Sequence, residues 1–269
     1  TLYYSATGTA RLLALEMADG LLTAGEQAGC AGLTGKLPFE RGQELDLLRH
    51  PPQQELGFKH DDLLILTSPV YSGRMPAPLQ ARLDKLRGER TPAIIAMTYG
   101  DRAYDDALLE LRDILSESGF VVIAAAAIVA QHSIFPMVAS GRPDRDDKQK
   151  IADFGRACSR ALDGFTGTER IQVKGSTPYC EAKAVPLQPS GSSKGNACGI
   201  CANLCPTKAI AAETPRKTDK TRCISCTACI AACPQGARDF HGPMYAVASK
   251  DFASVNKARR EPEFFGTGG

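Results

Sequence analysis

Seven cysteines lie between residues 198 and 233, and this run limits the fold and chemistry of the chain more than any other feature. Its second part is complete and ends before a proline: Cys223-x2-Cys226-x2-Cys229-x3-Cys233-Pro234. This spacing is typical of bacterial iron–sulfur sites, in which three thiolates of one tight loop bind one cluster. The fourth cysteine, before the proline, points away and binds the other cluster. The run therefore predicts two iron–sulfur clusters in the C-terminal third.

The two predicted clusters differ in their ligands. One has a full set of four cysteines and is expected to be a [4Fe-4S] cluster; its ligands are Cys205, Cys223, Cys226 and Cys229. The other has only three, because the position where its first cysteine should fall is Gly195; its ligands are Cys198, Cys201 and Cys233.

Three outcomes remain open for the second cluster. It is a [3Fe-4S] cluster, or a [4Fe-4S] cluster with an outside ligand on the open iron, or Cys180 supplies the fourth thiolate. The last outcome requires ordering of a distant loop, which costs conformational entropy. Zinc fits poorly, because a structural zinc ion takes four ligands, usually one C-x2-C pair from each of two knuckles.

Composition excludes several classes of function. The net charge of +2 argues against a dedicated nucleic-acid binder. Seven of the ten cysteines belong to the run, so a disulfide framework is not expected. A reducing, cytoplasmic location is expected instead. Cys30 and Cys158 are predicted to be ordinary thiols, and the four scattered histidines to have packing or surface roles. No signal peptide and no apolar run of about 18 residues is found, so no membrane span is expected.

The N-terminal part, residues 1–165, alternates strands and helices. Residues 24–60 lack a clear pattern, and Asp105-Asp106 is predicted to cap a helix rather than to act in catalysis. The clearest segments are strands at 2–4, 62–67, 93–98 and 120–128, and helices at 78–86, 105–118 and 145–165. This order predicts the α/β class, with a doubly wound parallel sheet covered by helices on both faces.

Ligands of such sheets bind beyond the carboxyl ends of the strands, where three loops are distinctive. Ser5–Ala10 offers hydroxyls and backbone N–H groups before a helix, which suits a phosphate, although an ordinary N-cap would also explain it. Ser68–Gly73 and Thr98–Arg102 carry Tyr71 and Tyr99 beside glycines. An aromatic ring with close backbone approach suits a flat heterocycle.

The three loops together resemble those of the flavodoxin family. Its phosphate loop, Thr/Ser-x-Thr-Gly-x-Thr, is matched by Ser5, Thr7, Gly8 and Thr9 and departs at Ala10. The resemblance implies FMN, with its isoalloxazine ring sandwiched by Tyr71 and Tyr99. The candidate FMN residues are therefore Ser5, Thr7, Gly8, Thr9, Ala10, Pro69, Val70, Tyr71, Ser72, Gly73, Thr98, Tyr99, Gly100 and Tyr104.

Nearly the whole chain resembles the bacterial family of flavodoxin–ferredoxin fusion proteins. Further matching pieces are Pro69–Tyr71, Tyr99–Asp106, Gln131–Ser133 and Glu263–Phe265. The expected organisation is a flavodoxin-like FMN domain at 1–165, a linker at 166–194, a small α+β bacterial-ferredoxin-like domain at 195–240, and a tail at 241–269 that packs on the first domain.

The resemblance implies electron transfer between FMN and two iron–sulfur clusters. Such a protein would link a one-electron and a two-electron partner, either redox proteins or small-molecule acceptors. Two alternatives remain: an FMN-dependent reductase of a small molecule fed by the clusters, and an iron–sulfur redox sensor. The sequence leaves the donor, the acceptor, the potentials and the oligomeric state undetermined.

Overall fold

The computed structural model describes residues 1–28 and 40–267, so Cys30 lies outside the described residues. A six-stranded sheet forms its centre, in the order β10-β7-β6-β4-β1-β2. The five strands from the N-terminal part pair in parallel: β1 (Leu2–Tyr3), β2 (Leu45–Asp46), β4 (Leu64–Pro69), β6 (Thr91–Tyr99) and β7 (Phe120–Val129). Their order is the doubly wound order 2-1-3-4-5 of flavodoxin-like sheets, which confirms the predicted α/β class.

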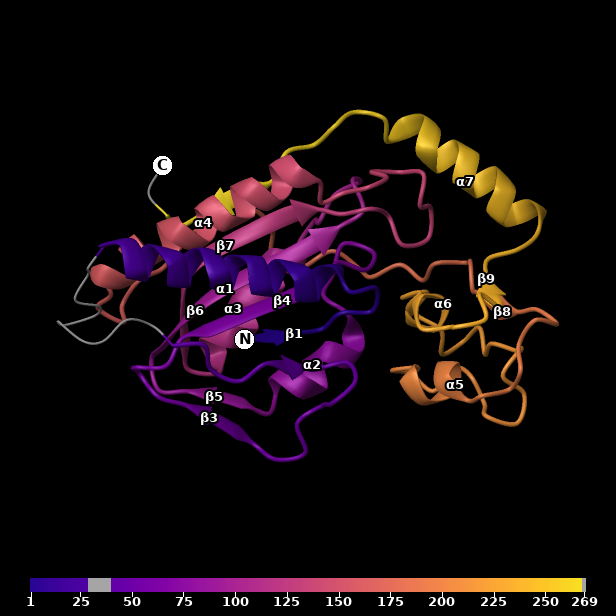
Figure 1. The fold of residues 1–269 in the computed structure, drawn as a ribbon, viewed down its shortest axis with the longest axis horizontal. Helices are drawn as coiled ribbons and strands as arrows, with labels where there is room; N and C mark the ends of the chain where they lie inside the picture. The colour runs from indigo at the N-terminus through magenta and orange to yellow at the C-terminus, as the bar shows by residue number, and fades with distance from the viewer. Residues whose placement is uncertain (29–39, 268–269) are drawn as a thin grey trace.

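Helices cover both faces of the sheet (Figure 1). On one face, α1 (Thr9–Ala28) and α4 (Arg145–Asp163) bury Leu13, Phe154 and Leu162 against alternate residues of β4, β6 and β7. On the other, α2 (Ala77–Leu83) and α3 (Ala107–Glu117) pack on the residues in between. Side chains of a strand point alternately to the two faces, so these parallel strands read as continuous apolar runs.

The close packing of α1 on α4 depends on two glycines. A Cβ atom on Gly20 would lie 2.4 Å from the carbonyl oxygen of Ala152, and one on Gly155 would lie 2.4 Å from that of Met17. No side chain fits at such a distance, so the two helix backbones touch there. A separate pair of short parallel strands, β3 (Leu56–Phe58) and β5 (Leu86–Gly88), lies beside the main sheet; the sequence pattern did not predict it.

The cysteine-rich segment forms a small separate module beyond the carboxyl ends of the sheet strands (Figure 1). It contains α5 (Ile200–Leu204), α6 (Ala228–Ala231) and an antiparallel pair, β8 (Ser190–Gly191) with β9 (Arg238–Asp239). The hydroxyl of Ser225 donates to the carbonyl of Leu187, so residues before 195 are also part of this unit.

After the module the chain returns to the first domain. Helix α7 (Pro243–Val255) packs Tyr245 and Phe252 against Phe135, and strand β10 (Glu263–Phe265) pairs antiparallel with β7. Phe264 stacks on Phe154 of α4 with ring centroids 4.8 Å apart. The sheet of the N-terminal part thus takes its outermost strand from the end of the chain.

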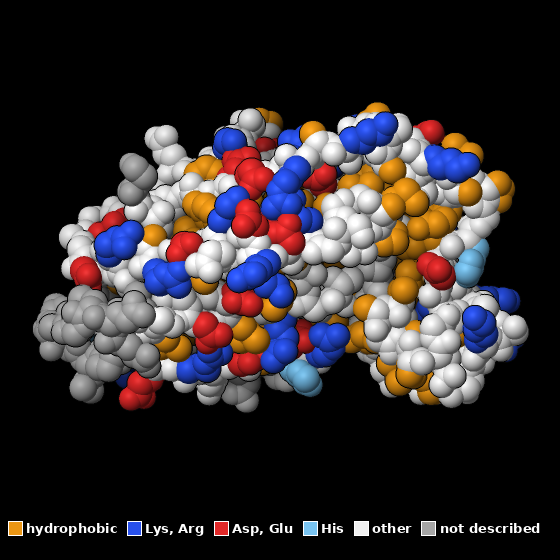
Figure 2. Space-filling view, turned by 45° about the horizontal axis from the view of Figure 1, so that its top comes forward, with side chains coloured by type: hydrophobic (Ala, Val, Ile, Leu, Met, Phe, Trp, Pro, Cys, Tyr) orange, Lys and Arg blue, Asp and Glu red, His pale blue; other side chains and the backbone are white. Residues whose placement is uncertain are grey.

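The surface is mixed in character. Figure 2 shows Lys and Arg side chains interspersed with Asp and Glu over the sheet domain, and hydrophobic side chains gathered toward the α7 end. Met244, Val247 and Val255 of α7 are all more than half exposed. No helix in the described ranges has the length and apolar character needed to cross a membrane.

Candidate functional site

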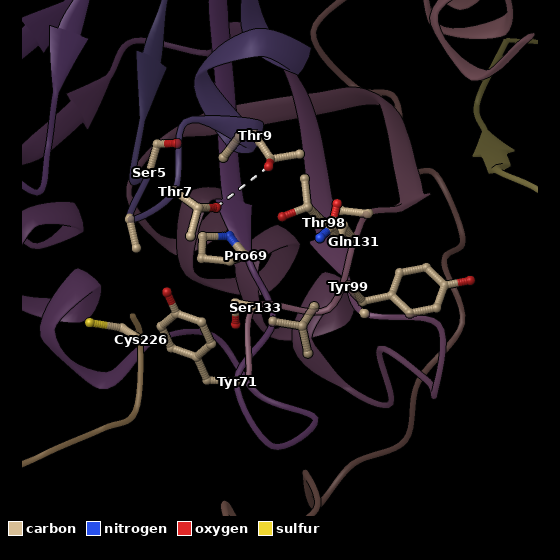
Figure 3. A pocket seen from close by; sticks show the side chains of 15 residues that line it. Ser5, Thr7, Thr9, Pro69, Tyr71, Thr98, Tyr99, Gln131, Ser133 and Cys226 are labelled. Carbon is tan, nitrogen blue, oxygen red and sulfur yellow. Dashed lines mark hydrogen bonds between the residues drawn. The ribbon is translucent and has the colours of Figure 1, made fainter. Parts of the chain in front are cut away.

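A pocket lies where the parallel strands end, as expected for a doubly wound sheet. It is formed by the loops after β1, β4, β6 and β7 and by one residue of the cysteine module (Figure 3). Its lining residues are Ser5, Ala6, Thr7, Thr9, Ala10, Pro69, Val70, Tyr71, Thr98, Tyr99, Gly100, Ala130, Gln131, Ser133 and Cys226.

The loop after β1 is shaped to receive an anion. The Ser5 hydroxyl accepts a hydrogen bond from the backbone N–H of Arg11 at 3.2 Å, which draws the loop around the start of α1. The hydroxyls of Thr7 and Thr9 are 3.5 Å apart and face the pocket together in Figure 3. The first N–H groups of a helix have no intrahelical partner, and the helix dipole favours negative charge there. These groups together suit a phosphate.

The two tyrosines of the predicted flavin sandwich are placed differently. Tyr71 presents its ring to the pocket, whereas the ring of Tyr99 is directed away from it (Figure 3). Tyr99 is only 4% exposed and packs edge-to-face on Tyr104, with ring centroids 5.3 Å apart. Burial, and then the charge of Cys226, raise the pKa of the Tyr71 hydroxyl well above its ordinary value, so this hydroxyl remains a hydrogen-bond donor.

Ten of the fourteen candidate FMN residues line this pocket. The other four do not: Gly8, Ser72, Gly73 and Tyr104. Tyr104 is buried and donates to a Glu263 carboxylate oxygen at 2.8 Å, so it holds strand β10 instead. Sequence reasoning omitted Ala6, Ala130, Gln131 and Ser133 from its site residues, and it named Cys226 only as a cluster ligand. The segment 130–133 follows a predicted strand and could have been included on that ground.

Cys226 joins the pocket to the cysteine module. It is 9% exposed and lies beside the Tyr71 ring, with its sulfur directed away from the pocket (Figure 3). Cys226 and Ala228 also pack into the main core of the sheet domain. A predicted cluster ligand therefore forms part of the wall of the predicted flavin pocket.

The module is built from two similar halves related by a shift of 28 residues, since 226 − 198 = 28 and 233 − 205 = 28. Equivalent positions in the two loops share left-handed backbone: Ala197 with Ser225, and Gly199 with Thr227. The sulfurs of Cys205 and Cys233 each accept a backbone N–H from the residue four positions later, at 3.2 and 3.3 Å. The same shift places Gly195 opposite Cys223.

The four cysteines of the complete set occupy one buried region. Cys205 and Cys229 belong to one hydrophobic cluster, against which Cys223 packs, and Cys226 lies on the side of the sheet domain. Among the described residues the buried Tyr4 hydroxyl has no hydrogen-bond partner, and the charges of Cys226 and Cys205 act on it. Cluster sulfurs would be acceptors for such an orphan donor, so these residues fit an iron–sulfur cluster.

The incomplete set surrounds a cavity of about 410 Å³. Cys198, Cys201 and Cys233 line it, and so does Gly195. Cys198 is exposed, whereas Cys205, Cys226 and Cys229 are buried. Within residues 1–28 and 40–267, no three Cys, His, Asp or Glu side chains are close enough to hold a single metal ion. The three thiols are thus separated by a space of the kind that a multi-iron cluster fills.

Cys180, the alternative fourth ligand, is held elsewhere. Its thiol lies 3.6 Å from the carbonyl of Gly73, and its backbone carbonyl accepts from the Arg74 guanidinium at 2.8 Å. The Asp106 carboxylate accepts the backbone N–H groups of Cys180 and Ser176 at 2.6 and 2.8 Å. Asp106 does stand at the N-cap position of α3, as expected, but its side chain does not cap the helix, because these linker amides take both carboxylate oxygens.

His132 is a partly buried histidine between two residues that line the pocket, Gln131 and Ser133. Its Nδ1 accepts the backbone N–H groups of Ile134 and Phe135, both at 3.1 Å, and its ring packs edge-to-face on Phe252 of α7. A Cβ atom on Gly100 would lie 2.5 Å from the ring, so only glycine fits there. Burial lowers the pKa of His132 to about 4.

Acidification should therefore destabilise the fold through His132. The unfolded chain binds this proton near pH 6.5, and the folded chain only near pH 4. Stability from the neutral ring is fully present above pH 6.5 and falls by about 3 kcal/mol as the pH approaches 4. Urea titrations at pH 7 and pH 5 measure it. His132→Gln should reduce the difference in the free energy of unfolding between pH 7 and pH 5, and the exposed His60→Gln should leave this difference unchanged. The same difference in the parent protein and both variants would contradict the role given to His132.

Comparison with known families matches both parts of the chain. Residues 57–133 match the family described as NADPH-dependent FMN reductase, and residues 217–239 match the family described as 4Fe-4S binding domain. No curated protein matches the sequence. The chain thus carries a flavodoxin-like, FMN reductase-type domain followed by a 4Fe-4S domain, the arrangement of a flavodoxin–ferredoxin fusion. The 4Fe-4S match includes Cys223, Cys226, Cys229 and Cys233 but not the first half of the module.

Proposed function

We propose that this flavodoxin–ferredoxin chain is an electron-transfer protein, with FMN at the sheet edge and two iron–sulfur clusters in the module. The observation that carries the proposal is that Cys226 belongs both to the complete cysteine set and to the wall of the sheet-edge pocket. FMN exchanges one or two electrons and an iron–sulfur cluster exchanges one. The protein contributes distance, burial and charge, and here it brings the two sites into contact.

The pocket residues have distinct roles in this proposal. The loop Ser5–Ala10 binds the phosphate, and Tyr71 covers one face of the ring. The pocket encloses about 40 Å³, whereas sites that enclose a whole ligand measure about 300–1,000 Å³. We infer that the phosphate loop is preformed, and that entry of the ring requires Tyr71 and the loop of Cys226 to move apart. Binding of the flavin would then be coupled to the position of the cysteine module.

The module residues hold and shield the clusters. Cys205, Cys223, Cys226 and Cys229 bind a [4Fe-4S] cluster that is buried against the sheet domain. Cys198, Cys201 and Cys233 bind the second, more exposed cluster, which faces away from the flavin and toward a partner. Burial acts to raise the pKa of the Cys233 thiol, but hydrogen bonds from the backbone N–H groups of Ala237, Gln235 and Arg238 outweigh it and lower this pKa. They therefore favour the thiolate, which is the form that binds iron.

The experiment that tests this function is anaerobic purification with flavin and iron analysis and EPR. We expect FMN in a 1:1 ratio, two distinct iron–sulfur signals, and reduction of the clusters when only the flavin is reduced by light. FAD, absence of flavin, or zinc in place of iron would overturn the proposal.

A reductase of a small molecule is the second candidate, because the cavity beside Cys198 is large enough for a ligand. Steady turnover of a quinone or nitro compound by the purified protein would favour it. Electron exchange with a redox protein, without such turnover, would favour the carrier.

A further inference from the structure

The cavity beside the incomplete cysteine set has an unusual charge. Four charged residues line it: Glu213, Arg216, Lys217 and Arg238. In the part of the chain that the structure describes, none of the three cations forms an ion pair with a carboxylate. The cavity therefore presents a surplus of positive charge next to three thiols.

Arg238 is the most constrained of these cations. It is 3% exposed, and its two terminal nitrogens donate to the carbonyls of Pro215 and Pro189. In the described part of the chain its Nε is buried without a nitrogen or oxygen partner, and its charge acts on Cys233 of this set and on Cys229 of the complete set. In the 28-residue repeat its counterpart is Ile210, a buried apolar residue of the other half, since 238 − 210 = 28. At this pair of equivalent positions, one half of the module therefore has a hydrophobic side chain and the other half has a cation.

Gly195 opens the same cavity. Its repeat counterpart Cys223 is a cluster ligand in the complete set, yet glycine is not required here by the backbone. Its φ is not positive, and a Cβ atom would meet only ordinary contacts, at 3.5 Å from the Ser192 carbonyl oxygen and 3.6 Å from the Ala237 Cβ. A cysteine would fit, so the position is free for a ligand from outside the chain.

We propose that this cavity binds a small anionic ligand, whose donor atom takes the position at the second cluster that Gly195 leaves without a thiolate, and whose charge pairs with Arg238. This inference rests on the proposed function, because it requires an iron–sulfur cluster at Cys198, Cys201 and Cys233. The cluster must be a [4Fe-4S] cluster whose open iron carries water. Binding of a thiol then forms one iron–sulfur bond, displaces that water and releases the thiol proton to solvent, and no electron is transferred. A charged hydrogen bond to a buried guanidinium selects anions over neutral molecules.

The test uses the full chain with FMN and both clusters, titrated anaerobically with two probes. Mercaptoacetate carries a thiol and a carboxylate, and mercaptoethanol carries a thiol and a neutral hydroxyl. EPR and visible spectra of the clusters report binding. We expect mercaptoacetate to change the signal of the second cluster alone and to bind about ten-fold more tightly than mercaptoethanol.

Three variants locate the site. Gly195→Cys should abolish the response to both probes, because an internal thiolate occupies the position. Arg238→Ile, matched to Ile210, should remove the preference for mercaptoacetate and retain weak thiol binding. Lys217→Gln changes an exposed cation in the same cavity wall and should also reduce the preference for mercaptoacetate. This variant replaces Arg238→Ile in the test if Arg238→Ile does not fold. Lys220→Ile, which lies outside the cavity lining, is the control and should behave as the parent protein.

A response that persists in Gly195→Cys, equal affinities for the two probes, or a three-iron signal that neither probe changes would overturn this inference. Normal flavin and complete-cluster signals in the same sample would show that the proposed function survives such a failure. Absence of flavin or of both clusters would instead reject the proposed function itself.

Discussion

Replacing Cys226 with alanine is expected to remove the [4Fe-4S] cluster next to the pocket and to stop electron exchange between the flavin and the module. Cys226 is buried, packs into the main core and lines the pocket, so its loss acts on both sites. Because cluster binding supplies folding free energy to so small a module, we also expect the module to lose order. Iron content should fall by about half or more, whereas FMN should still bind the sheet domain.

Cys180→Ser is the matched control for this prediction. Cys180 is hydrogen-bonded to the sheet domain at Gly73 and Asp106 and is not part of the cavity lining. Iron content, EPR signals and flavin-to-cluster reduction should therefore be those of the parent chain. Loss of the second cluster in Cys180→Ser would revive Cys180 as its fourth ligand, and normal cluster reduction in Cys226→Ala would refute the contact role of Cys226.

Replacing Asp147 with alanine is expected to destabilise the sheet domain by about 3–5 kcal/mol. Asp147 is fully buried and forms a bidentate ion pair with Arg142, which is 9% exposed. Removal of the carboxylate leaves the buried guanidinium with only a longer contact to Asp144, at 3.9 Å, which is far more costly than loss of an exposed pair. The same carboxylate accepts the backbone N–H of Asp144 and completes the capping box of α4.

The effect should extend to the pocket. The Arg142 carbonyl accepts the backbone N–H of Gln131, and its guanidinium donates to the carbonyl of Arg260 in the returning tail. We therefore expect weaker FMN retention together with a lower urea midpoint. The control is Asp146→Ala, one residue away and 78% exposed, which should change stability by no more than about 0.5 kcal/mol. Equal midpoints for the two variants would contradict the role assigned to the buried pair.

The sequence predicted the regular part of the fold because its signals are local. Uninterrupted apolar runs marked β4, β6 and β7, and amphipathic patterns marked α3 and α4. The missed strands are β2, β3, β5, β8, β9 and β10, which have two or three residues each and exist only through pairing with distant strands. Helix α7 was missed because its pattern is weak and much of its apolar surface remains exposed.

In the candidate site too, features with a local sequence signal were predicted and features set by distant contacts were not. The cysteine spacing and the phosphate loop could be read directly, and the shift of 28 residues already marked Gly195 as the missing ligand position. The orientation of Tyr99 could not, because it depends on packing against Tyr104. The position of Cys226 in the pocket wall could not be predicted either, because it depends on how the module packs against the sheet domain. The helix start at Asp106 was predicted, but the partners of its side chain were not, because they are linker amides about 70 residues later in the sequence.

The late arrival of β10 has a consequence for biosynthesis. During translation the ribosome completes β7 long before it produces Glu263–Phe265, so the edge of the nascent sheet stays unpaired while the cysteine-rich part emerges. Cofactors can bind before β10 pairs with β7. Once this pair has formed, the chain is attached to the sheet domain both before and after the module. A protein cut between the module and β10 would retain the predicted cluster ligands and yet expose the unpaired edge of β7, and we expect it to self-associate.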